Sequence, residues 1–310
     1  MIDPRGFRQA CRGAALAGLA LLATGILPLP TRAQATPARL AVDDGRLMLD
    51  QPGAGPVDLS GIAGAEITLQ DGLVLRLEGA RAETVASGRT VWLHRVSVAD
   101  AARGWRPLCE PHADGTREVL FLRGRNSGDG SLTDDPAGVE MSCTAGAQAK
   151  CLRFGYRPWG READGSPSLA LYNACVRMVR ADYGGRGEPT TENGRLIDVY
   201  DDLGLQRPDL LSGQHFEAGW GPQGAVCVAA PRVPGNITPA QIEQRYPQLR
   251  GQVGPVCTEA YARSRGAILF NRSGPIPRSG AQSGQRLGQD DIDRRPAPKA
   301  SVSSSRPSSM

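Results

Sequence analysis

Residues 169–185 read LALYNACVRMVRADYGG and carry the helical pattern around which the rest of the chain is organised. At about 100° per residue, the large apolar side chains of this stretch fall on one broad face. They are Leu169, Leu171, Tyr172, Cys175, Val176, Met178, Val179 and Tyr183, with Asn173, Arg177 and Arg180 opposite. We predict one central amphipathic helix that packs against the rest of the protein. Gly184 and Gly185 are expected to end it, because glycine readily takes the left-handed conformation found after helices.

One acidic residue departs from this pattern. Asp182 falls inside the apolar arc, near the helix C-terminus, where the helix dipole disfavours a negative charge. We therefore expect an arginine to compensate its charge.

Polar and aromatic residues upstream of the helix are candidates for a shared site with Asp182 and Tyr183. They are Lys150, Arg153, Arg157 and Trp159, and Lys150 is one of only two lysines in the chain. If Lys150 lay near Asp182, the pair could bind a small anion or zwitterion, or tune a general base. The favoured interpretation is structural: a buried aspartate paired with arginine to fix the helix against a sheet.

Alternating apolar residues predict a strand-rich α+β fold, with antiparallel sheets packed on the helix. The N-terminal strands are expected at residues 40–42, 47–49, 67–70, 73–76 and 91–98, and the later ones at 118–123, 138–143, 149–156, 196–200 and 225–229. Thr238 and Pro239 predict the start of a second helix that runs to Tyr246. His94 falls on the apolar side of its strand, so we expect it to be a packing histidine.

Six cysteines remain once Cys11, which lies in the N-terminal leader, is set aside. They are Cys109, Cys143, Cys151, Cys175, Cys227 and Cys257, an even number that favours disulfides in an exported chain. Six cysteines allow fifteen pairings, of which we favour Cys143 with Cys151, Cys227 with Cys257, and Cys109 with Cys175. A zinc site is disfavoured, because no C-x-x-C pair occurs. No metal or other cofactor is predicted.

Residues 1–35 have the pattern of a cleaved secretory signal peptide. Basic residues precede an apolar run at residues 14–30, and Ala33-Gln34-Ala35 resembles a signal-peptidase site. An uncleaved anchor is the rival interpretation, although the run is short for a transmembrane span. Removing Arg5, Arg8, Arg12 and Arg32 together with Asp3 lowers the 36 basic and 32 acidic residues to 32 and 31. A nearly neutral mature chain does not favour nucleic-acid binding.

Several blocks of sequence resemble the bacterial ADYC-domain family, which is named after a tetrapeptide. The segment ACVRMVRADYGG at residues 174–185 resembles its signature, and four further blocks match in order: WRPLC at 105–109, CTAG at 143–146, KCLRFGYRPW at 150–159 and GPQGAVC at 221–227. The resemblance implies no catalytic residues. Gly184 stands where the family has cysteine, so this chain has no thiol there.

Four regions follow from these patterns. They are a signal peptide at residues 1–35, a β-hairpin region at 36–104, an ADYC-like core at 105–270 and a disordered tail at 271–310. The hairpin region is either a separate small domain or one layer of the same body.

The sequence favours a periplasmic or extracellular protein with a non-catalytic binding or envelope-associated role, and an envelope or surface protein as a possible partner. The alternative is a secreted hydrolase or transferase with a site around Asp182 and Lys150. No nucleophile elbow, zinc helix, P-loop or dinucleotide fingerprint supports an enzyme.

Overall fold

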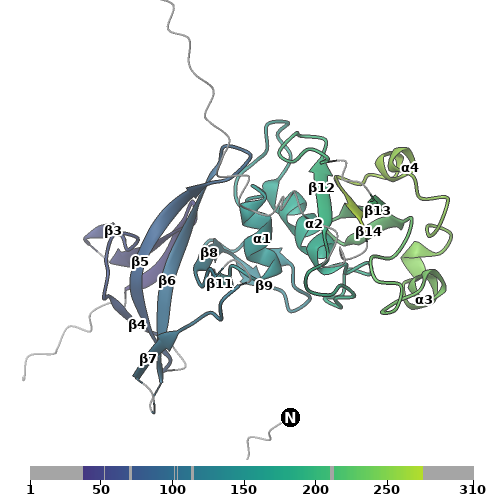
Figure 1. Ribbon diagram of the computed structural model, residues 1–310. Helices are drawn as coiled ribbons and strands as arrows, with labels where there is room; N and C mark the ends of the chain where they lie inside the picture. The colour runs from purple at the N-terminus through teal and green to yellow at the C-terminus, as the bar shows by residue number, and fades with distance from the viewer. Residues whose placement is uncertain are drawn as a thin grey trace, which may run out of the picture. The chain divides into compact units, whose positions relative to one another are not determined.

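The fold is described by a computed structural model that covers residues 38–274, apart from residues 52, 70, 71, 101, 103, 113, 114 and 210–212 (Figure 1). The predicted signal peptide, with Cys11, and nearly all of the predicted tail lie outside these residues. The described part is rich in antiparallel strands, as predicted, but it contains more helices than the two that the sequence analysis expected.

The N-terminal half is built from hairpins. β1 (Arg39–Asp43), β2 (Arg46–Gln51) and β3 (Gly55–Asp58) form a three-stranded antiparallel sheet. A second sheet has the order β11-β8-β6-β5-β4, and its strands are β4 (Glu66–Thr68), β5 (Val74–Thr84), β6 (Thr90–Asp100), β8 (Val119–Arg123) and β11 (Val139–Cys143). β7 (Gly104–Pro107) also pairs with β6, so the boundary predicted after residue 104 lies within this sheet. β9 (Arg125–Asn126) and β10 (Leu132–Thr133) form a small separate ladder.

The C-terminal half combines helices with a four-stranded sheet of order β12-β15-β13-β14. Its strands are β12 (Ile197–Asp201), β13 (His215–Gly221), β14 (Gly224–Val228) and β15 (Leu269–Ser273). The helices are α1 (Ala147–Arg153), α2 (Ser168–Arg180), α3 (Pro239–Arg245) and α4 (Glu259–Ser264), and a 3₁₀ turn, η1, spans Pro247–Leu249. Thr238 caps α3 with the capping box that its sequence predicts.

The prediction of a strand at residues 149–156 is wrong, because α1 occupies most of this stretch. Its residues AQAKCLR are good helix formers. The apolar alternation that suggested a strand instead places Ala149, Cys151 and Leu152 on the buried side of a helix.

The predicted helix at 169–185 is α2, but it is more deeply buried and shorter than expected. Asn173 and Arg177, predicted on the polar face, are both buried, so the helix has protein on nearly every side. Asn173 bonds to both backbone groups of Leu132 on β10, at 2.9 Å each. Ala181, rather than Gly184 or Gly185, takes the left-handed conformation (φ 49°) that ends the helix.

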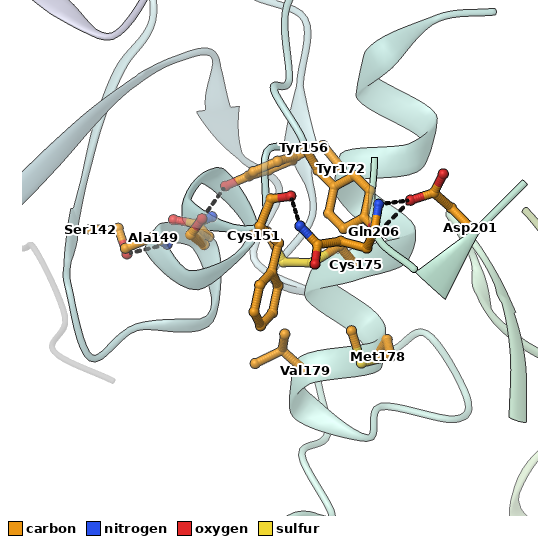
Figure 2. The surroundings of a disulfide bond; sticks show 12 residues. Ser142, Ala149, Cys151, Tyr156, Tyr172, Cys175, Met178, Val179, Asp201 and Gln206 are labelled. Atoms are coloured by element: carbon orange, nitrogen blue, oxygen red, sulfur yellow. Dashed lines mark hydrogen bonds between the residues drawn. A yellow bond between two sulfur atoms is a disulfide. The ribbon is translucent and has the colours of Figure 1, made fainter. Parts of the chain in front are cut away.

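The three disulfides join Cys109 to Cys143, Cys151 to Cys175, and Cys227 to Cys257. Only the third matches the preferred pairing. Pairing Cys143 with Cys151 assumed a hairpin, but α1 starts between them and turns Cys151 toward Cys175 on α2 (Figure 2). Cys109 follows β7 in the same sheet as Cys143, and so it takes this nearer partner instead of Cys175.

The largest hydrophobic cluster surrounds α1 and α2, and a second lies among the N-terminal sheets. His94 is buried in the second sheet, as predicted: its ring packs edge-on against Phe121, and its Nε2 lies 3.3 Å from the carbonyl oxygen of Gly45. Within the described residues, no helix is long and apolar enough to cross a membrane.

Candidate functional site at the end of α2

Asp182 is fully buried just beyond the end of α2, and arginine compensates its charge as the sequence predicts. Its carboxylate accepts a hydrogen bond from Arg177 Nη1 at 2.8 Å, and backbone N–H groups of Arg186 and Gly187 donate to it at 3.1 and 2.8 Å. Charge-assisted hydrogen bonds of this kind are the strong ones in proteins. The carboxylate is therefore held by three donors from within the chain.

Arg177 links Asp182 to the loop between β9 and β10. Its Nη2 lies 2.8 Å from the Asp129 carboxylate, whose side chain is 38% exposed. Burial raises the pKa of Asp129, but hydrogen bonds from Ser127, Ser131 and Arg177 outweigh burial and bring it well below its usual value. Arg177 is thus a buried cation between two carboxylates, one sealed and one at the surface.

Tyr183 belongs to a second buried network. Its hydroxyl donates to Glu217 at 3.1 Å and accepts from the backbone N–H of Arg232 at 2.8 Å, while its ring stacks on Trp220. Burial, with the nearby Glu217 carboxylate, raises the pKa of Tyr183 well above its usual value. Asn271 donates to Glu217 at 2.9 Å and accepts from the indole of Trp220 at 2.8 Å. The phenol therefore connects the segment after α2 to Glu217 on β13, and Asn271 extends this network to β15.

Arg232 and Glu217 form a two-bond ion pair, with distances of 2.9 and 3.0 Å, that is shielded from solvent. The same guanidinium also donates to the backbone carbonyls of Met178 and Val179, in the last turn of α2. Helix C-terminal carbonyls lack partners within the helix. Arg232 therefore both neutralises Glu217 and caps α2.

Thr190 satisfies the next two carbonyls of the chain. Its backbone N–H donates to Arg180, and its hydroxyl donates to Ala181 at 2.6 Å. The end of α2 is thus capped by side chains and backbone from distant segments.

The six residues predicted to share a cleft lie in three places. Asp182 and Tyr183 are at the end of α2. Lys150 and Arg153 are on α1, where burial lowers the pKa of Lys150 and Arg153 Nε lies 3.0 Å from Glu83. Arg157 and Trp159 both donate to Asp44 at the β1–β2 turn, at 2.9 and 3.0 Å.

A cavity beside this third group is small. Trp92, Trp159 and Arg157 are among its lining residues, and its volume of about 10 Å³ is close to that needed by one water molecule. Within the described part of the chain, no cluster of three or more histidine, cysteine or acidic side chains is placed to hold a metal ion.

Glu217, Arg232 and Asn271 were missed by sequence reasoning. Only Glu217 had a local signal, since it is an acidic residue within the otherwise apolar and aromatic run of β13. Its partners lie 15 and 54 residues away along the chain, beyond the reach of any local pattern.

The fold and the network at the end of α2 define a disulfide-linked α+β domain in which residues 181–184, ADYG, are all buried. The model of the ADYC domain matches residues 58–234, which is more than half of the chain. The protein therefore belongs to the ADYC-domain family. No curated protein and no solved structure matches the chain.

The fourth residue of the family's tetrapeptide is Gly184 in this chain, and the structure gives a physical reason to keep it small. A Cβ atom at this position would collide with the ring of Tyr246. The Tyr246 hydroxyl donates to Glu188 at 2.9 Å, which fixes the ring over the glycine.

Proposed function

We propose that this protein is an exported, non-catalytic module that binds a partner or associates with the cell envelope, in the periplasm or outside the cell. Three disulfides support an oxidising compartment, because disulfides persist there and are rare in the cytosol. The signal-like pattern of residues 1–35 supports the same location.

The main support for a non-catalytic role is that Asp182 is buried and that its carboxylate is already hydrogen-bonded within the chain. Its carboxylate has no exposed surface and already accepts from Arg177, Arg186 and Gly187. A general acid or base must reach the substrate within hydrogen-bond distance. Asp182 is better suited to anchoring α2. Residues 181–183, ADY, would then stabilise the fold around one central helix.

The alternative is a secreted hydrolase or transferase with a site at Asp182 and Lys150. Against it stands the separation of the two residues: Asp182 pairs with Arg177, whereas Lys150 lies on α1. Lys150 makes no ion pair with any residue that the structure describes. The partner of a binding module is then expected at the surface, away from the end of α2.

We further propose that the mature chain starts after residue 35 and consists of a hairpin region at 36–104 and a core from 105. The core includes β15 (Leu269–Ser273), so the predicted tail would start after this strand and not at residue 271. The sheet shared by β5, β6, β7 and β8 supports a hairpin region that is one layer of the same body.

Cell fractionation tests the location. When the full chain is produced in a bacterial host, its N-terminus should be Thr36, and it should be found in the periplasm or medium. Its cysteines should react with an alkylating reagent only after reduction. A chain that keeps its leader and has free thiols in the cytosolic fraction would contradict the proposal.

Thermal-shift screening separates the two functions. Small anions and zwitterions are added to the wild-type chain and to Lys150→Met, a variant that removes the charge and keeps a long unbranched side chain at this half-buried position. We expect no compound to stabilise the wild type through Lys150. A compound that raises the Tm of the wild type but not of Lys150→Met would favour the enzyme.

A further inference from the structure

The outer edge of β5 is open over half of its length. β4 pairs with β5 only from Val74 to Arg76, beside the end of β5 that lies away from the hairpin tip (Figure 1). The chain before β4 adds two backbone bonds at Leu77. Beyond a bulge at Gly79, no further strand pairs with this edge among the residues that the structure describes.

The ladder with β6 determines which backbone groups face outward. Val85 donates to the carbonyl of Arg89 at the hairpin end, and the register is unbroken from Thr84 back to Gly79. Since bonding alternates in an antiparallel ladder, Arg81 and Glu83 direct their backbone groups to β6. The N–H and C=O groups of Ala80, Ala82 and Thr84 therefore point away from the sheet. No hydrogen bond satisfies these groups within the described part of the chain.

The side chains along this edge are self-complementary about Ala82. If a second copy of the edge lies antiparallel with Ala82 opposite Ala82, then Ala80 faces Thr84 in bonded pairs. In this register Arg81 of each copy lies opposite Glu83 of the other, and opposite charges on facing strands are favourable. A register centred on Arg81 would place two arginines face to face, and one centred on Glu83 would place two glutamates together.

We propose that two copies of this chain pair through the outer edges of β5, with a two-fold axis at Ala82. The occupant of the edge is a second copy because the charges select a symmetric register. Ala82 is exposed and small, which allows the backbones to approach. Within one copy, Arg81 contacts both Glu83 and Glu118, and Glu83 also pairs with Arg153, so these contacts hold the two charged side chains along the face of the sheet. Charged residues also protect an edge strand from unspecific pairing.

Sedimentation analysis of the oxidised full chain across the micromolar range tests this interface. The wild type should be in monomer–dimer equilibrium, because an interface limited to one strand edge is small. Arg81→Glu and Glu83→Arg should each weaken dimerisation about tenfold or more, since like charges then face each other. The double variant with both substitutions should restore the dimer.

Two further variants show whether a loss of the dimer comes from the interface or from misfolding. Ala82→Pro removes an outward N–H without breaking the ladder to β6, so it should give a folded monomer with an unchanged circular dichroism spectrum. Arg265→Glu makes the same charge change at an exposed residue after α4 and should leave the dimer intact. A wild type that is monomeric throughout, a dimer unaffected by Ala82→Pro, or a double variant that fails to recover would overturn the proposal. Binding of an extended peptide to a monomer would also overturn it, because the edge would then serve a different occupant.

Discussion

Replacing Asp182 by asparagine tests how strongly the network at the end of α2 stabilises the fold. The change preserves the shape of the side chain but removes its charge. It also replaces one accepting oxygen by an amide group, which cannot accept a hydrogen bond. In the wild type, one carboxylate oxygen accepts from Arg177 and Gly187, and the other accepts from Arg186. Either orientation of the amide would place a donor against a donor.

The size of the effect follows from burial. Removing one partner of a buried ion pair typically costs about 3–5 kcal/mol, because the remaining charge is left uncompensated. Arg177 still has Asp129, so we expect a loss near the lower end, about 3 kcal/mol. In a domain of this size that corresponds to a fall in Tm of roughly 6–12 °C.

Urea denaturation of the oxidised chain, followed by tryptophan fluorescence, measures this loss. Asp129→Asn is the matched control, because it removes a charge from the same arginine at a side chain that is 38% exposed. It should cost only about 1 kcal/mol. A loss below about 1 kcal/mol for Asp182→Asn, or equal losses for the two variants, would refute the view that the buried carboxylate anchors α2.

Three further changes test other parts of the account. Gly184→Ala should destabilise the fold by about 1–3 kcal/mol through the collision with the adjacent aromatic ring, whereas Gly235→Ala, with open space around it, should change stability little; comparable losses in denaturation would contradict the packing argument. Removing the disulfide with alanine at Cys151 and Cys175 should cost about 3 kcal/mol, given a separation of 24 residues, and a Tm equal to that of the wild type would count against it. Burial lowers the pKa of His94, so below about pH 6.5 the unfolded chain takes up a proton that the folded chain does not. The free energy of unfolding should fall as the pH drops below this value, and His94→Gln should remove that part of the pH dependence; an unchanged profile in the variant would show that other groups cause it.

The sequence was most informative where local pattern and burial agree. The helix at α2, the capped α3 and the N-terminal hairpins follow from side-chain periodicity and turn residues. The need for an arginine near Asp182 was predictable because an unpaired buried charge is costly.

The failures have a common physical cause, which is that tertiary contacts overrode local signals. Short apolar alternation at α1 fits a strand as well as a buried helix, and packing against α2 decides between them. Asn173 and Arg177 looked solvent-exposed because their partners come from distant segments: Leu132 on β10 lies 41 residues earlier, and Asp129 in the preceding loop lies 48 residues earlier. The wrong pairing of Cys143 with Cys151 has the same origin, because α1 was predicted as a strand.

Amide hydrogen exchange in the oxidised wild-type chain tests the central claim most directly. The backbone N–H groups of Arg186 and Gly187 donate to the sealed carboxylate of Asp182. If this network anchors the core, both amides should exchange only through global unfolding, with the same free energy as the buried amides of α2. Exchange at a much lower free energy, while α2 stays protected, would show that the segment opens independently and would contradict the account.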